Sequence, residues 1–329
     1  SKDFSVFYSF RERGDIIVKI HQYDAAANMI DSMRLRNFGR IFHTPNFGLI
    51  ASHNKQKALI YYFEAGKEIY AFCYDIPSQV IQWEQTFVMG EEDQLRDFDQ
   101  MLLDDEGNLH IVFDKNNRKG KIENHYFEIL EYGPRLGMNP HLYKIAMEGY
   151  LTFDAFFEYD NLNDRLVAGG LYYVDNRNWS EGYFYLNVNT LNPPDAVVKF
   201  QPFDVDFVAL LNRQRSKKAK GVPEGEIQEV VLRRDGGILM LGELSKIQER
   251  GTNPSAISPR LYGSVDYYYE DIFAISIHPD GREHWKQVMH KKQYSQDDDA
   301  VYSSYFLLKT PSALRVIFND EVKYETTVS

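Results

Sequence analysis

The sequence has little cysteine, no long apolar run and no excess of basic residues. Its single cysteine, Cys73, cannot form an internal disulfide, and its apolar surroundings at 69–74 are typical of a buried small side chain. No run approaches the ~20 apolar residues that span a bilayer, so no transmembrane segment is predicted. The net charge of −11 argues against nucleic acid as a partner, because its phosphates need a basic face.

Several strong catalytic signatures are also absent. The chain has no GxSxG nucleophile elbow, no GxxxxGKS/T phosphate loop and no HExxH zinc helix. Its 9 histidines are scattered, and His284 and His290, on one predicted strand, have no obvious third ligand nearby. The acidic stretches 104–108 and 297–299 lack the spacing of an EF-hand loop. We therefore predict no cofactor and no metal site.

Aromatic residues, in contrast, are abundant. They make up 15% of the 329 residues, led by 23 Tyr and 22 Phe. Because aromatic and β-branched side chains favour half-buried pleated surfaces, this composition indicates β structure. No window of a dozen residues sustains the i, i+3, i+4 apolar spacing of an amphipathic helix, so little helix is expected.

Two kinds of predicted β-hairpin alternate along the chain. In the outer hairpin, an alternating apolar strand and a turn rich in Pro, Gly, Asn or Asp precede a more polar strand. Its copies lie at 15–35, 69–87, 125–145, 182–200 and 273–289. In the inner hairpin the second strand is a near-continuous apolar run, such as LVAGGL, which suits a strand covered on both faces. Its copies lie at 42–64, 98–114, 153–174, 229–245 and 302–320.

The inner hairpins recur at spacings of 56, 55, 76 and 73 residues. The two longer spacings contain loop insertions at 212–225 and 248–269, and without such loops the period approaches that of the first two. One inner and one outer hairpin together make a four-stranded unit. Four-stranded antiparallel sheets at a fixed period are typical of a β-propeller.

We therefore predict an all-β fold, a single β-propeller domain over residues 1–329 with five four-stranded blades. The chain opens with an outer hairpin and closes with an inner one, so the two can pair into one blade and close the ring. The segment FSVFYSF at 4–10 also indicates a strand and competes for the closing blade, which leaves a sixth, incomplete unit open. A β-sandwich with irregular hairpins is the other alternative.

Three carboxylates stand near the start of successive inner hairpins, namely Asp99, Asp154 and Glu229. Five-bladed propellers include glycoside hydrolases, which need a general acid and a second carboxylate in the central channel. These residues are the catalytic candidates of an enzymatic alternative. Acidic residues are common at strand ends, however, and a chain with 48 of them produces such coincidences without any catalytic role.

Aromatic side chains in predicted loops are candidate contacts for a protein partner or a sugar ring. They are Tyr172, Tyr173, Trp179, Tyr267, Tyr268 and Tyr269. The same residues can instead cap the hydrophobic ends of the sheets. The basic loop at 212–225 is a second candidate contact element, through Arg213, Arg215, Lys217 and Lys218.

The last quarter of the chain, from YYYEDIFAISI (267–277) onwards, has a Trp strand, a Lys-Lys-Gln turn, an acidic run and a Ser-Ser strand. This order resembles uncharacterised Bacteroidota cell-envelope proteins. The resemblance implies an extracytoplasmic, propeller-like protein, such as an accessory subunit of an outer-membrane transport or secretion assembly. It carries over no catalytic residue. The N-terminal Ser-Lys-Asp would also suit a lipoprotein trimmed after an acylated cysteine upstream of Ser1.

The expected function is a non-enzymatic protein-binding module that docks onto a membrane-associated assembly in the periplasm or at the cell surface. The alternative is a glycoside hydrolase or carbohydrate-binding propeller that uses Asp99, Asp154 and Glu229. The two differ in geometry, because an enzyme requires carboxylates that converge within about 5 to 10 Å, the separation range of glycosidase pairs.

Overall fold

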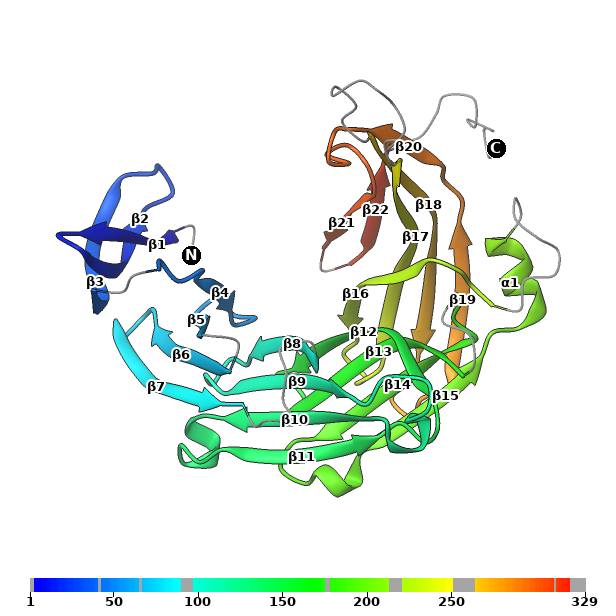
Figure 1. Ribbon diagram of the computed structural model, residues 1–329, viewed down its shortest axis with the longest axis horizontal. Helices are drawn as coiled ribbons and strands as arrows, with labels where there is room; N and C mark the ends of the chain where they lie inside the picture. Colours follow the sequence, from blue (N-terminus) through cyan, green and yellow to red (C-terminus); the bar gives the residue numbers. More distant parts are fainter. Residues whose placement is uncertain are drawn as a thin grey trace, which may run out of the picture. The chain divides into compact units, whose positions relative to one another are not determined.

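The computed structural model describes residues 3–40, 43–64, 67–89, 97–174, 178–212, 221–250, 264–310 and 312–319. The prediction of an all-β fold is confirmed, since these residues form six antiparallel sheets (Figure 1). Their one α-helix is α1 (Val205–Leu211), which begins where the Asp204 carboxylate accepts a hydrogen bond from the Phe207 N–H. Within this part of the chain, no helix has the length and apolarity to cross a membrane.

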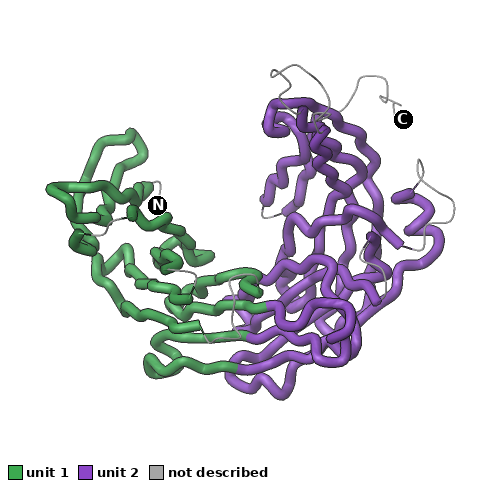
Figure 2. The backbone as a smooth tube through the Cα atoms, viewed as in Figure 1, with its two compact units in different colours: residues 1–113, 129–142 green, residues 114–128, 143–329 purple. Residues whose placement is uncertain are grey.

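The chain divides into two compact units, residues 1–113 with 129–142 and residues 114–128 with 143–329 (Figure 2). Two sheets belong to the first unit. They are formed by β1 (Phe4–Glu12), β2 (Asp15–Tyr23) and β3 (Met29–Arg40), and by β4 (Gly48–Ala51), β5 (Lys57–Glu64), β6 (Glu68–Asp75) and β7 (Val80–Val88). A third sheet has residues in both units and consists of β8 (Phe98–Leu103), β9 (Leu109–Lys115), β10 (Tyr126–Tyr132) and β11 (His141–Ala146).

Three further sheets belong to the second unit. The first consists of β12 (Leu151–Asp160), β13 (Arg165–Tyr173), β14 (Gly182–Asn189) and β15 (Val197–Pro202). The next consists of β16 (Gly225–Leu232), β17 (Ile238–Arg250), β18 (Ser264–Ile277) and β19 (Glu283–Met289), with β20 (Gln293–Gln296) paired to β18. The last is the hairpin of β21 (Tyr305–Lys309) and β22 (Leu314–Phe318).

Every predicted hairpin is present as a pair of adjacent strands, and four of the inner hairpins join the outer hairpin that follows them into one sheet, in the predicted order. Five four-stranded blades are not found in the described residues. The N-terminal sheet has three strands, because FSVFYSF adds β1 to it, and the C-terminal sheet has two. Closure of a ring by these two sheets stays a prediction.

The middle strands of the second unit are buried on both faces, as the apolar run LVAGGL predicts. Residues 166–173 of β13 and 182–188 of β14 are all buried. Val167 and Leu171 pack in one hydrophobic cluster with Ile238 and Met240 of β17, in the next sheet. The apolar side chains of neighbouring sheets therefore cover each other. These strands lack the alternation of apolar and polar residues that is typical of a strand with one face in solvent.

Glycine stands opposite a large aromatic ring at two places in these sheets. Gly170 of β13 pairs with Phe184 of β14, and Gly242 of β17 pairs with Phe273 of β18. A Cβ at Gly170 would lie 2.3 Å from the Phe184 ring, and one at Gly242 would lie 2.1 Å from the Phe273 ring. Each ring thus fills the space that a side chain would need.

An extra residue interrupts the pairing near the start of β8, β12 and β16, the first strands of three successive sheets. These extra residues are Asp99, Phe153 and Gln228. Such a bulge bends the strand and re-aims the side chains beside it. Asp154 and Glu229 therefore hold the same register position, directly after the extra residue, whereas Asp99 is itself the extra residue.

Candidate functional site

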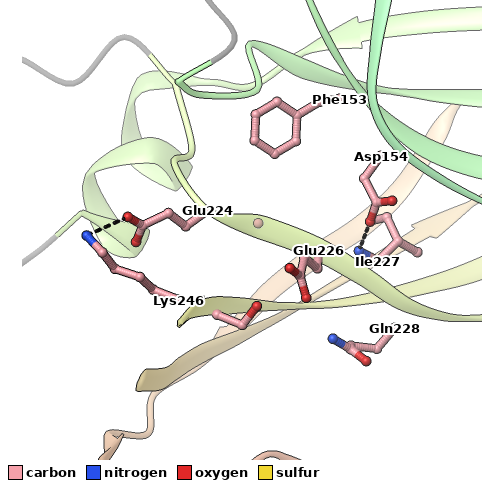
Figure 3. A pocket seen from close by; sticks show the side chains of 9 residues that line it. Phe153, Asp154, Glu224, Glu226, Ile227, Gln228 and Lys246 are labelled. Atoms are coloured by element: carbon pink, nitrogen blue, oxygen red, sulfur yellow. Dashed lines mark hydrogen bonds and ion pairs between the residues drawn. The ribbon is translucent and has the colours of Figure 1, made fainter. Parts of the chain in front are cut away.

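A pocket of about 580 Å³ opens beside Asp154 in the second unit (Figure 3). Its walls come from the start of β12, from the first half of β16 with the residue before it, and from the middle of β17. The lining residues are Phe153, Asp154, Glu224, Gly225, Glu226, Ile227, Gln228, Ser245 and Lys246. Two of the three bulge residues, Phe153 and Gln228, are among them, so the pocket lies where two neighbouring strands depart from regular pairing.

Asp154 is the half-buried acid of this pocket. Its carboxylate Oδ2 accepts a hydrogen bond from the Ile227 N–H at 2.5 Å. Burial raises the pKa of the Asp154 carboxyl to about 6; the N–H groups of Ile227 and Ala155 oppose this rise, and the charge of Glu226 adds to it. A carboxyl whose pKa lies this close to neutral pH is suited to donating a proton in general acid catalysis.

The other side chains of the pocket are mainly polar. Glu224 and Lys246 form an ion pair at 3.0 Å, with both side chains partly exposed to solvent. Figure 3 shows this pair and the Glu226 carboxylate at the pocket, together with the ring of Phe153. The pocket thus offers one carboxyl of raised pKa, a second carboxylate, a charge-balanced pair and one aromatic ring.

Of the three carboxylates that the sequence grouped, Asp154 is the one that lines this pocket. Glu229 forms an ion pair with Lys309 of β21 and is not among the lining residues. Asp99 is exposed on β8, in the first unit. Within the described residues the second carboxylate beside Asp154 is Glu226, three positions before the predicted Glu229.

Sequence reasoning missed Glu226, Glu224 and Lys246. Glu226 alternates with the buried Gly225 and Ile227, which is the ordinary pattern of a solvent-facing strand residue. No local signal marks it as part of a pocket, because its neighbour Asp154 belongs to another sheet. The bulges on both strands are a usable signal, but they are visible only once the strand register is known.

The predicted aromatic contacts divide into buried and accessible residues. Tyr172 and Tyr173 are each only 4% exposed, and Tyr172 packs against Tyr150 and Phe200. Their rings therefore belong to the interior rather than to a rim. Trp179 is half-buried, and its ring lies against Gly221, where an added Cβ would be 2.6 Å away.

The three consecutive tyrosines lie within a strand rather than in the loop that was predicted. β18 begins at Ser264, so Tyr267, Tyr268 and Tyr269 form its first half, and all three are half-buried. The predicted insertion 248–269 is correspondingly shorter, because β17 extends to Arg250. The basic residues of the other insertion lie outside the described residues; they are Arg213, Arg215, Lys217 and Lys218.

Two buried charged clusters are not among the residues that line the pocket. In the first unit His110 contacts Glu131 at 2.9 Å and Asp104 at 3.4 Å, and Asp104 also pairs with Arg135 at 2.8 Å. In the second unit the fully buried Glu243 and Lys291 form an ion pair. The part of the chain that the structure describes holds no cluster of three or more His, Cys, Asp or Glu side chains arranged for a metal ion.

Comparison with known proteins gives structural likenesses only. No protein-family model matches the chain, and no curated protein matches it. An uncharacterised protein from Listeria monocytogenes shares 10% identity at a TM-score of 0.42, and the match covers 88% of this chain and 64% of that one. A DUF4221 family member from Bacteroides vulgatus shares 9% identity at a TM-score of 0.41, over 88% and 86% of the two chains. A GH43 β-1,3-galactosidase shares 11% identity at a TM-score of 0.36, over 96% and 72%.

Proposed function

We propose that the pocket beside Asp154 binds a saccharide and that the protein is a glycoside hydrolase with Asp154 as its general acid. The observation that carries this proposal is the presence, in one open pocket, of a carboxyl with a pKa raised to about 6 and a second carboxylate, Glu226. Glycoside hydrolases need this combination, because one carboxyl must hold a proton while the other is ionised.

The rest of the lining suits a sugar. The Glu224–Lys246 pair and the Gln228 amide can donate to and accept from hydroxyl groups, and the pair adds no net charge. The Phe153 ring offers a flat apolar surface for the C–H face of a pyranose. A neutral saccharide therefore matches the pocket better than an anionic ligand, which the carboxylates would repel.

In the proposed reaction Asp154 gives its proton to the glycosidic oxygen as the bond to the anomeric carbon breaks. The Glu226 carboxylate either takes a proton from an attacking water or attacks the anomeric carbon itself, and water then releases the sugar. Both routes consume one water. In the direct route the proton of that water ends on Glu226, and Asp154 is reprotonated from solvent; in the covalent route Asp154 takes the proton of the water that cleaves the glycosyl-enzyme. The anomer released first distinguishes them, because direct attack by water inverts the configuration.

The test is hydrolysis of a panel of neutral aryl glycosides at pH 5.5, with release of the phenol as the measurement. We expect Asp154→Asn to lower kcat/KM by about 100-fold or more on any substrate that is cleaved, because Asn cannot donate the proton. Glu226→Gln should cause a comparable loss, and Glu249→Gln, at an exposed glutamate of β17, should cause none.

Two results would count against this assignment. If Glu229→Gln removed activity and Glu226→Gln did not, the pair predicted from the sequence would replace the one in the pocket. If no glycoside in the panel were bound or cleaved by the wild-type protein, the hydrolase proposal would be wrong.

A second candidate function is a protein-binding module of the cell envelope, docked onto an outer-membrane assembly. The observation that favours it is a concentration of exposed apolar side chains near the C-terminus: Val301, Tyr302, Phe306, Leu314 and Ile317 are 39–78% exposed. In a five-bladed propeller the pairing of β21–β22 with the N-terminal sheet would cover some of them. A pull-down from detergent-solubilised envelope tests the docking role, and recovery of the protein alone would argue against it.

A further inference from the structure

The sheet that contains β17, β18 and β20 carries an aromatic surface beside the pocket. Lys246, which lines the pocket, stands opposite Tyr268 of β18, and Tyr268 stands opposite Tyr294 of β20. Directly opposed residues of antiparallel strands point to the same face, so these three side chains form a row across the sheet. The row extends over two strand spacings, about 10 Å from Lys246.

The two tyrosine rings are held in place and remain accessible. Their centroids lie 5.2 Å apart with an angle of 43° between the ring planes, and Tyr294 is 51% exposed. The Tyr294 hydroxyl donates to Asp266 Oδ1 at 2.9 Å. This anchor fixes the tilt of the Tyr294 ring while leaving its surface open.

Asp266 also holds Arg250 beside the rings. The Asp266 carboxylate is only 1% exposed, because the Arg250 guanidinium covers its Oδ2 and Tyr294 covers its Oδ1. Arg250 itself keeps 56% of its side chain exposed. The pair is charge-balanced, so the surface presents fixed rings and guanidinium donors without a net charge.

From this arrangement we infer that the face formed by Arg250, Asp266, Tyr268 and Tyr294 is a binding track for an oligosaccharide whose end occupies the Asp154 pocket. Tyrosine rings stack on the C–H faces of pyranose rings, and the guanidinium donates to their hydroxyls. A neutral track that continues a neutral-ligand pocket fits an uncharged glycan chain. The substrate class is therefore a chain of several sugars rather than a disaccharide, and this inference rests on the proposed function of the pocket.

The experiment measures dissociation constants by calorimetry for neutral gluco-, galacto-, manno- and xylo-oligosaccharides, from disaccharides to hexasaccharides. It uses the full chain in its Asp154→Asn form, so that ligands are not consumed. We expect hexasaccharides of the recognised sugar to bind about tenfold more tightly than its disaccharide. Tyr294→Ala should remove this gain and leave disaccharide binding unchanged.

Two further variants separate stacking from other effects. Tyr294→Phe keeps the ring and loses only the hydroxyl, so it should retain most of the gain with chain length. Trp285→Ala removes an aromatic side chain of β19 that is 41% exposed and lies outside the row, and it should bind all ligands like the parent. Thermal melts of each variant exclude loss of folding as the cause.

The outcomes distinguish this inference from the proposed function. If disaccharides bind and hexasaccharides bind no more tightly, the binding track is wrong and the pocket assignment stands. The same holds if Tyr294→Ala still binds hexasaccharides more tightly than disaccharides. If no saccharide of any length binds, the proposed function fails and the track fails with it. If Tyr294→Ala leaves glycan binding unchanged and weakens capture of a protein partner instead, the surface is a protein interface.

Discussion

Asp154 of β12 accepts a 2.5 Å hydrogen bond from the backbone N–H of Ile227, the second residue after Gly225 at the start of β16. This contact joins two successive sheets of the second unit. It fixes the position of the Asp154 carboxylate at the edge of the pocket. Because both strands carry a bulge at this point, the contact depends on two local departures from regular pairing.

The raised pKa of Asp154 predicts a cost in stability. Below about pH 4 the Asp154 carboxyl is mainly protonated in both the folded and the unfolded protein. Between pH 4 and 6 it ionises in the unfolded protein while it stays mainly protonated in the folded one. Rising pH in this range therefore destabilises the folded protein. Moving the pKa from 3.8 to about 6 penalises the folded state by roughly 3 kcal/mol above pH 6. Asp154→Asn removes this penalty, since its amide oxygen can still accept from Ile227.

Urea unfolding of the wild type and Asp154→Asn from pH 4 to pH 8 measures the effect. We expect the variant to gain stability relative to the wild type as pH rises, and to be the more stable protein at pH 7. Parallel stability curves would mean that Asp154 has an ordinary pKa in the folded protein, which would also weaken its assignment as general acid.

His110 should make the opposite contribution to the pH dependence. Burial lowers the pKa of this fully buried imidazole, but its hydrogen bonds to Asp104 and Glu131 outweigh burial and raise the pKa above 6.5. The stabilisation from the charged imidazole is fully present below pH 6.5 and is lost as pH rises through the folded pKa. His110→Gln should therefore cost more at pH 6 than at pH 9, roughly 3 kcal/mol at the lower pH.

Denaturant melts at the two pH values test this, with His53→Gln as the control because His53 is exposed in the same unit. The control should change stability by less than about 0.5 kcal/mol at either pH. An equal cost of His110→Gln at both pH values would show that the imidazole contributes through packing and not through its charge.

Substitutions of the buried ion pair Glu243–Lys291 should have non-additive effects on the free energy of unfolding. Both side chains are 0% exposed, and Lys291 also donates to the Tyr269 carbonyl at 3.2 Å. Glu243→Leu or Lys291→Met alone removes the opposite charge from a buried group, which typically costs 3 to 5 kcal/mol. The double variant should cost far less than the sum of the two.

A double-mutant cycle from urea melts measures this coupling. The exposed pair of Arg34 and Glu12, whose side chains are 58% and 44% exposed, is the comparison and should couple by less than about 1 kcal/mol. Additive effects of the two buried substitutions would refute a direct interaction between them.

The glycine opposite Phe273 should tolerate no side chain. An added Cβ at Gly242 would lie 2.1 Å from the Phe273 ring, so Gly242→Ala forces the ring out of its packed position. We expect a loss of about 1 to 3 kcal/mol in unfolding free energy, as for other overpacked cores. Phe273→Leu in the Gly242→Ala background should recover part of the loss, whereas in the wild type it should destabilise.

The sequence predicted the strands well because their signals are local. The run LVAGGL is apolar at consecutive positions and lies in a strand covered on both faces, and turns such as that at Asp280 and Gly281 mark where hairpins reverse. The pairing of the chain ends has no such signal, since it depends on contacts between segments some 300 residues apart. This difference between local signals and long-range pairing explains why the hairpins were confirmed and five complete blades were not.

The candidate site was predictable only in part, for a related reason. Asp154 stands out in sequence as an acid within an apolar strand, FDAFF. Glu226 looks like any solvent-facing residue, and only the neighbouring sheet makes it part of a pocket. For Tyr172 the sequence left an exposed contact and a cap on the sheet ends open; its ring packs against Tyr150 and Phe200, and propensity alone cannot distinguish these environments.

The electrostatic link between Asp154 and Glu226 gives a prediction that needs no substrate. The charge of Glu226 helps to raise the pKa of Asp154, so Glu226→Gln should lower that pKa below its wild-type value of about 6. Carbon-13 NMR of the aspartate carboxyl groups follows the titration directly, with Asp154→Asn to assign the resonance. Glu249→Gln should leave the midpoint unchanged, because that exposed glutamate is not among the groups that shift Asp154. A midpoint that stays near 6 in Glu226→Gln would mean that burial alone sets the pKa, and Glu226 would then lose its place as the second carboxylate of the site.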